Sequence, residues 1–292
     1  MTAALLCLTA CRGQVVGYDD DGRVIPLPDG RPDIGVDAQP DARPDRQVPD
    51  PCSPEGTEIY AVSHEHELYR FHPPSHQFTL VSTLECPTPG QPFSMAVSLY
   101  DYAYVLYYSP SPEWTCVGVN QVDIVTGECV AQTPFDCQNT AGFQLFGMGF
   151  AKDGTALDEE TLYISDQPAG TPRLGILDLE TWTPRFVANI GSPAQSSAEL
   201  VGDGSGSLWG FFGWDPAPFF ARLDKQTGGL DQQVTVAQSN PGFAMAAARW
   251  GGDFYLFVGT ANESTALRVR NGNVTEHTSY EFTIVGAGNS IC

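Results

Sequence analysis

The sequence predicts an all-β protein, a five-bladed β-propeller whose ring is closed when the C-terminal strand joins the first blade. The first observation behind this prediction is an aromatic-centred apolar strand that recurs five times at intervals of 44 to 59 residues, centred on Tyr60, Tyr104, Tyr163, Trp209 and Tyr255. Repeats of about 40–50 residues that contain only strands are typical of propellers, in which each repeat forms one four-stranded sheet.

The second observation is a segment of small residues that precedes four of these strands, at 94–97, 147–150, 200–202 and 244–247. Small side chains suit the innermost strand of a blade, because the inner strands of all the blades crowd around the axis. We therefore expect these four segments to line the centre of the ring.

The third observation concerns the two ends of the repeat region. Residues 57–84 supply three strands without an inner strand, whereas residues 242–282 supply a complete blade. The small-residue segment 283–288 is left over. We expect it to become the inner strand of the first blade, which removes two open sheet edges.

Three of the predicted third strands lead into an Asp-x-x-Thr pattern, which begins at Asp123, Asp178 and Asp224. An Asp side chain at the start of a turn accepts hydrogen bonds from the backbone amides that follow it. We therefore interpret these aspartates as turn residues rather than catalytic groups.

Residues 1–11 are predicted to be a lipoprotein signal with its lipobox. A short leucine-rich run leads into Leu8–Cys11, which matches the bacterial lipobox, and the sulfur of Cys11 would carry the lipid. Arg12 follows the cysteine, and in lipoprotein sorting a residue other than Asp there favours the outer membrane. The alternative is a secretory signal that is cleaved elsewhere.

Residues 12–51 are predicted to be a disordered tether, because Asp and Pro alternate through most of this segment. Prolines impose extended backbone and like charges repel one another, so the segment has no means of building a core. The propeller domain is assigned to residues 52–292. Together these segments predict a domain held in the cell envelope, attached to the membrane by a lipid anchor alone.

The net charge of −21, with Lys152 and Lys225 as the only lysines, excludes the usual nucleic-acid-binding proteins, because such a surface repels phosphate backbones. The charge has an ordinary role in solubility, and we expect a monomer.

Six cysteines follow the lipobox, and an even number in an exported protein favours disulfides over metal ligands. The order of the predicted strands suggests three pairs: Cys52–Cys292, Cys86–Cys129 and Cys116–Cys137. A zinc site is the alternative, but no two of these cysteines have C-x₂-C spacing.

The candidate ligand face is formed by the loops between second and third strands, together with the loops that enter the inner strands. These segments contain His64, His66, Trp114, Asp166, Glu199, Trp214 and Asp215. If residues 64–66 continued a strand, both imidazoles would point the same way, which makes His64 and His66 weak metal candidates. The two tryptophans suit stacking on a glycan or a peptide, and Glu199 starts an inner strand.

Several stretches are similar to a group of uncharacterised myxobacterial lipoproteins. The resemblance covers roughly 80–292 and is carried by 92–97, 105–107, 133–135, 145–150, 160–163, 250–257 and 282–288. It implies an exported, lipid-tethered propeller, and it supplies no catalytic residues.

The sequence therefore favours a non-enzymatic binding or scaffold protein for a protein or glycan partner. We expect no cofactor, because the chain has no nucleophile elbow, P-loop or dinucleotide fingerprint. One alternative is a metal-dependent hydrolase or lyase that uses the funnel of the propeller. The other is a purely structural component of the envelope.

Overall fold

A computed structural model describes residues 58–111, 114–154, 159–236 and 242–290, together with two short strands near the N-terminus. Those strands, β1 (Val16–Tyr18) and β2 (Val24–Pro26), pair antiparallel within a unit that spans residues 1–46. The second unit spans residues 47–292 and holds the remaining strands. The lipobox, the rest of the predicted tether, Cys52 and Cys292 lie outside the described residues.

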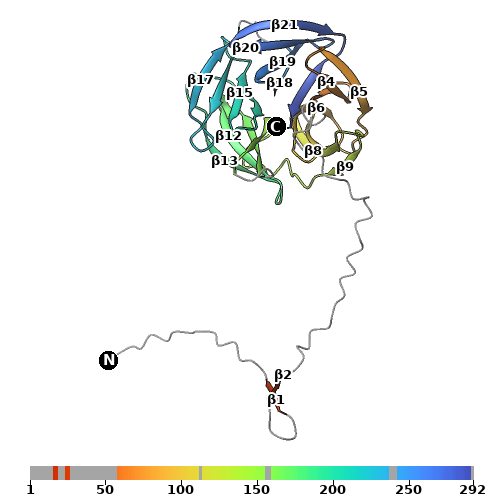
Figure 1. Cartoon of the computed structure of the whole chain (residues 1–292), viewed down its shortest axis with the longest axis vertical. Coiled ribbons are helices and arrows are strands. Elements are labelled where there is room, and N and C mark those ends of the chain that lie inside the picture. Colours follow the sequence, from red (N-terminus) through yellow and green to blue (C-terminus); the bar gives the residue numbers. More distant parts are fainter. Residues whose placement is uncertain are drawn as a thin grey trace, which may run out of the picture. The chain divides into compact units, whose positions relative to one another are not determined.

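The second unit is a ring of five four-stranded antiparallel sheets, which confirms the predicted propeller (Figure 1). From the axis outwards, the first blade contains β22 (Ile284–Asn289), β3 (Ile59–Ser63), β4 (Glu67–His72) and β5 (Gln77–Thr83). The second contains β6 (Gln91–Val97), β7 (Tyr102–Ser109), β8 (Thr115–Asp123) and β9 (Cys129–Gln132).

The remaining three blades follow the chain in order. The third contains β10 (Gly147–Lys152), β11 (Glu160–Asp166), β12 (Arg173–Asp178) and β13 (Thr183–Asn189), with a 3₁₀ turn, η1 (Pro168–Gly170), before β12. The fourth contains β14 (Glu199–Gly202), β15 (Leu208–Phe212), β16 (Phe219–Leu223) and β17 (Leu230–Thr235). The fifth contains β18 (Ala244–Trp250), β19 (Asp253–Gly259), β20 (Ser264–Arg270) and β21 (Asn273–Tyr280).

The C-terminal strand closes the ring as predicted. Strand β22 pairs antiparallel with β3, and Ala287 and Gly288 lie opposite Ala61 and Tyr60. The first blade is thus built from both ends of the propeller sequence. The edges of β22 and β3 that face each other are both hydrogen-bonded, so neither is left open.

The inner strands have small residues because their backbones approach one another closely. A Cβ atom added to Gly202 in β14 would lie 1.9 Å from the carbonyl oxygen of Phe150 in β10. Larger side chains from the middle strands fill the wedges between blades, as Tyr104 does against Phe150, with 5.6 Å between the ring centroids. The hydrophobic core therefore lies between the blades, and the axis is packed with small residues.

The Asp-x-x-Thr segments form the turns between the third and fourth strands of their blades. The Oδ1 atoms of Asp123, Asp178 and Asp224 each accept two hydrogen bonds from backbone amides two and three residues later, at 2.8–3.0 Å. This contact confirms a turn role for all three carboxylates.

Two of the expected disulfides are present. Cys86, in the connection between the first and second blades, is bonded to Cys129 at the start of β9, and the two Cα atoms are 5.3 Å apart. Cys116 in β8 is bonded to Cys137, with 5.6 Å between Cα atoms. The Cys52–Cys292 pair lies outside the described residues.

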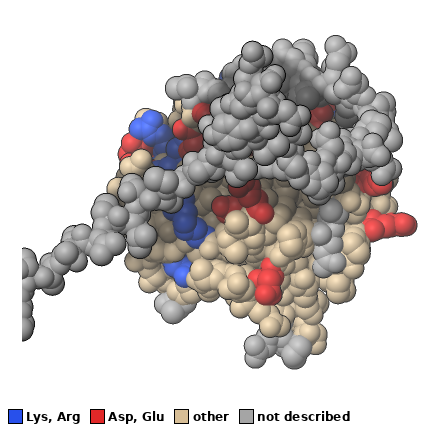
Figure 2. Space-filling model, turned by 90° about the horizontal axis from the view of Figure 1, so that it is seen from below, with Lys and Arg blue, Asp and Glu red and all other residues tan. Residues whose placement is uncertain are grey.

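Basic side chains are few on the surface that Figure 2 shows, and those visible lie along one side of it, while acidic side chains are scattered. In the described ranges, no helix has the length and apolar character needed to cross a bilayer.

Candidate functional site

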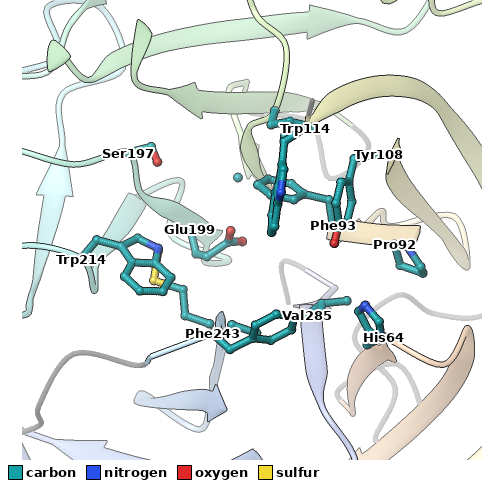
Figure 3. Close-up of a pocket in the computed structure, with 14 residues that line it drawn as sticks. His64, Pro92, Phe93, Tyr108, Trp114, Ser197, Glu199, Trp214, Phe243 and Val285 are labelled. Atoms are coloured by element: carbon teal, nitrogen blue, oxygen red, sulfur yellow. The ribbon is translucent and has the colours of Figure 1, made fainter. Parts of the chain in front are cut away.

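The candidate site is a pocket at one end of the ring, where loops and strand ends of all five blades meet (Figure 3). The pocket has an empty volume of about 580 Å³, which includes part of its open mouth. Further along the axis, between the middles of the inner strands, the empty space falls to about 210 Å³.

The carboxyl group of Glu199 lies at the bottom of the pocket. Glu199 is the first residue of β14, is only 7% exposed, and accepts a hydrogen bond of 3.2 Å from Ser94 Oγ at its Oε2 atom. Burial raises the pKa of Glu199 to about 8, against the smaller opposing effect of the Ser94 hydrogen bond. The carboxyl group is therefore mostly protonated at neutral pH while the pocket holds no cation.

Glu199 is the one acidic residue among the 14 described residues that line the pocket, and none of them is Lys or Arg. The other side chains with polar atoms in this lining are His64, Ser197, Tyr108 and the two tryptophans. An ionised Glu199 would thus face the pocket without a positive partner.

The walls of the pocket are aromatic. Trp114 lies nearly parallel to Tyr108, with ring centroids 4.7 Å apart, and Phe93 packs edge-on against Tyr108 at 5.8 Å. Trp114 is still 57% exposed, and Trp214 and Phe243 are each 38% exposed. Figure 3 shows the Glu199 carboxyl group in the space between Trp114, Trp214 and Phe243.

His64 lies in the lining, but His66 does not. The two residues belong to the turn between β3 and β4, where His66 has a φ of 66°. The ring of His64 packs edge-on against Phe243, whereas the ring of His66 packs against Tyr107, each at 5.8 Å between centroids. The segment is a turn and not a strand, so the two imidazoles do not point the same way.

Asp166 and Asp215 do not line the pocket. Asp166 accepts hydrogen bonds from Arg173 Nε at 2.8 Å and Nη2 at 2.6 Å, and both residues lie at paired positions of β11 and β12. Asp215 accepts the backbone amide of Gln195 at 3.2 and 3.1 Å. Both carboxylates are buried and have structural partners.

The structure brings His64, Trp114, Glu199 and Trp214 together at one site. Sequence reasoning missed the aromatic residues Phe93, Tyr108 and Phe243 that share it. A signal for two of them was present, because Phe93 and Phe243 lie at or just before the small-residue inner strands, as Glu199 does. The entrance to each inner strand is the position that faces the mouth of the funnel.

Among the described residues, no three His, Cys, Asp or Glu side chains lie close enough together to hold a metal ion. Glu199 and His64 in the lining are two potential ligands at most.

No protein-family model matches this chain, and no curated protein matches it significantly. Solved structures resemble it at low identity. A nidogen–laminin complex has 11% identity over 80% of this chain and 80% of that chain, with a TM-score of 0.47. A Bacteroides caccae protein of unknown function has 9% identity over 79% and 97%, with a TM-score of 0.47. The calcium-binding protein regucalcin from Agrobacterium tumefaciens has 16% identity over 80% and 76%, with a TM-score of 0.42.

Proposed function

We propose that this chain is a lipid-anchored binding protein of the cell envelope, which captures a protein or glycan partner by a group that enters the funnel pocket. The observation that carries the proposal is the pocket itself. Trp114, Trp214 and Phe243 come from three different loop regions and keep exposed faces around one buried carboxyl group. Exposed aromatic residues that converge in this way are typical of binding sites.

Binding without catalysis is favoured by the chemistry of the lining. Glycoside hydrolysis needs two carboxyl groups, and acyl transfer needs a nucleophile within reach of a base. The described lining has a single carboxyl group, and Figure 3 places Ser197 and His64 on opposite sides of the pocket. A single acid surrounded by aromatic rings can hold a group in place, which supports a binding role.

The test of this function compares how much envelope material the full-length wild-type protein and its variants retain. Envelope glycan and protein fractions are passed over the immobilised wild-type protein and over a double variant, Trp114→Ala with Trp214→Ala. The matched control is Phe186→Ala, because Phe186 is 48% exposed in β13 and lies outside the pocket. We expect the double variant to lose the retained fraction and the control to keep it. Equal retention by all three proteins would rule out the pocket as the binding site.

The anchor is tested separately, because it rests on the sequence. Cys11→Ala in the native host should abolish the incorporation of a labelled fatty acid into the protein, since the lipid has no other attachment point in the lipobox. Incorporation that persists in the variant would contradict lipid anchoring at Cys11.

A further inference from the structure

Aromatic rings from several blades converge on the space around Glu199. Trp114 is supported on one side by Tyr108, at a tilt of 25°, and Tyr108 is held in turn by the edge contact with Phe93. Trp214 and Phe243 face the same space from other blades (Figure 3). The face of an aromatic ring carries partial negative charge and attracts cations, most strongly for Trp.

The acidic group of the pocket favours a cation in the same way as the aromatic rings do. Glu199 supplies one acidic group, and no basic residue of the described lining neutralises it. Among the described residues of the lining, the other titratable groups are His64, from the turn after β3, and Tyr108, from β7. Burial raises the pKa of Tyr108, which keeps that hydroxyl neutral. Glu65, whose Oε1 atom lies 4.0 Å from His64 Nδ1, adds an acidic group next to His64.

The scarcity of hydrogen-bonding groups decides between classes of cation. A metal ion or a primary ammonium group is strongly hydrated and needs several oxygen ligands to replace its water. The described lining offers one carboxyl group and few other polar side chains. An ammonium group whose hydrogens are replaced by methyl groups has little such need, and its apolar surface packs against aromatic rings.

A neutral sugar fits the lining less well for the same reason. Its hydroxyl groups need several donors and acceptors once they leave water, and an unpaired buried hydroxyl is costly. Most of the lining is aromatic or aliphatic.

We infer that the group which enters this pocket is an alkylated ammonium cation, held among the rings of Trp114, Trp214 and Phe243 with the Glu199 carboxylate as its counter-ion. This inference rests on the proposed function and names the chemical class that the pocket selects, whether the cation is free or attached to a larger partner.

Proton release should accompany binding. The carboxyl group of Glu199 must ionise to act as a counter-ion, so the cation and the proton compete for it. Affinity for the cation should rise about tenfold per pH unit as the pH approaches about 8, and level off above it. Protonation of His64 would also oppose the cation, so the His64→Gln variant is needed to isolate the contribution of Glu199.

The experiment uses choline, tetramethylammonium and ethanolamine as cationic probes, and dimethylbutanol as the neutral probe, because in it a carbon replaces the nitrogen of choline. Binding to the full chain is followed by tryptophan fluorescence and by titration calorimetry. We expect choline and tetramethylammonium to bind, and both ethanolamine and dimethylbutanol to bind at least about tenfold more weakly. Choline affinity should increase with pH in the wild type and in His64→Gln, and be low and independent of pH in the double variant Glu199→Gln with His64→Gln.

Glu199→Gln should fold, because the carboxyl group it replaces is mostly protonated in the empty protein and has nearly the same shape. The wild-type pH profile gives an independent reading if the variant is poorly folded. Equal affinity for choline and dimethylbutanol would overturn the inference, as would a pH dependence that persists in the double variant Glu199→Gln with His64→Gln.

Failure of this inference can be told apart from failure of the proposed function. If choline does not bind but an uncharged glycan fragment is retained through Trp114 and Trp214, the pocket is a binding site for a different class of group. If neither the cations nor any envelope fraction depends on these tryptophans, both proposals are wrong. If choline binds to the pocket and Phe186→Ala leaves its affinity unchanged, both the proposed function and this inference are supported.

Discussion

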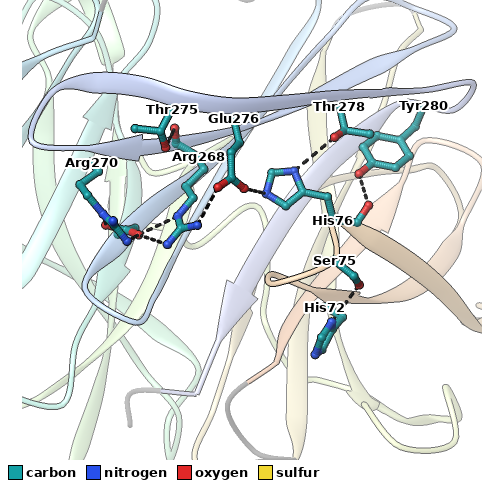
Figure 4. A network of polar contacts seen from close by, with 10 residues as sticks. His72, Ser75, His76, Arg268, Arg270, Thr275, Glu276, Thr278 and Tyr280 are labelled. Atoms are coloured by element: carbon teal, nitrogen blue, oxygen red, sulfur yellow. Dashed lines mark hydrogen bonds and ion pairs between the residues drawn. The ribbon is translucent and has the colours of Figure 1, made fainter.

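The imidazole Nε2 atom of His76 lies 2.9 Å from the Oε2 atom of Glu276, which joins the first blade of the ring to the last (Figure 4). His76 is in the turn between β4 and β5, and Glu276 is in the outer strand β21. The two atoms are close, but they do not form an aligned hydrogen bond. Nδ1 of the same ring lies 3.2 Å from Thr278 Oγ1, so two residues of β21 hold one side chain of the neighbouring blade.

Glu276 is itself part of a longer chain of charges. Arg268 donates to Glu276 at 2.9 Å and to Asp253 at 2.7 Å, and Arg270 donates to Asp253 at 2.8 and 2.7 Å. The hydrogen bond from Arg270 is the main reason that the pKa of Asp253 is below its usual range. A continuous series of charged contacts therefore links Arg270 and Asp253 to the residue that His76 contacts.

We predict that His76→Ala destabilises the propeller by about 2–3 kcal/mol. His76 is 9% exposed, and its ring also packs against Phe71 and Tyr255. The substitution therefore leaves a cavity where the first blade contacts the fifth. The free energy of unfolding is measured by denaturant titration. His72→Ala is the control, because His72 is exposed and bonds only to Ser75 among the contacts found in the described chain. Equal losses for the two variants would contradict a sealing role for His76.

Glu199 gives a prediction about stability and pH. Its pKa is raised from 4.5 to about 8 on folding, so the stability associated with the protonated carboxyl group is fully present below about pH 4.5 and is lost as the pH rises to about 8. The unfolding free energy of Glu199→Gln minus that of the wild type should therefore increase by about 4 kcal/mol between about pH 5 and about pH 9.

Glu160 provides a matched comparison at a different place in the fold. It is the first residue of β11, accepts the backbone amide of Leu99 at 3.1 Å, and has its pKa raised to about 7 by burial. The unfolding free energy of Glu160→Gln minus that of the wild type should increase by a smaller amount with pH, and the increase should level off above about pH 7. A flat difference for Glu199→Gln would mean that the carboxyl group is already solvated in the native state.

The close approach of inner strands predicts an intolerant site at Gly202. A Cβ atom there would meet the carbonyl oxygen of Phe150 at 1.9 Å, and neither backbone can retreat without opening the ring. We expect Gly202→Ala to lose more than about 3 kcal/mol or to fail to accumulate as soluble protein. Gly191→Ala is the control, since its Cβ would have its nearest neighbour at 3.7 Å. Circular dichroism and soluble yield of the two variants decide the matter.

The architecture could be predicted from the sequence because each blade repeats the same physical requirements. A middle strand needs an apolar aromatic centre such as Tyr163, and an inner strand needs small residues such as those at 147–150. The C-terminal closure followed because the first blade lacked one strand and the segment 283–288 had no other place.

The site was less predictable because it depends on contacts between blades and on turn geometry. The positive φ of His66 separates it from His64, and the register of β11 and β12 sets Arg173 beside Asp166. Neither relationship has a local signature in the sequence. The contribution of Phe243 to the pocket likewise depends on where the fifth blade lies beside the others.

The two disulfides lead to a prediction about how the ring resists unfolding. Cys86–Cys129 spans 43 residues and crosses from one blade to the next, whereas Cys116–Cys137 spans 21 residues. In the chain-entropy account a bridge stabilises by restricting the unfolded chain, and doubling the enclosed loop adds only about 0.6 kcal/mol. We therefore expect the two Cys→Ser double variants to lose about 2–4 kcal/mol each and to differ by less than about 1 kcal/mol.

Denaturant titrations with and without reductant provide the measurement, and non-reducing peptide mapping identifies the bridges. When reductant is added, the free energy of unfolding should fall less in the double variants than in the wild type, because each variant has one bridge fewer to break. If reductant breaks both mapped bridges and the stability of the wild type does not fall, the bridges do not stabilise the protein by restricting its unfolded chain. A bridge between Cys52 and Cys292 would appear in the same map, and because it encloses the whole propeller sequence its removal should cost more than either of the others.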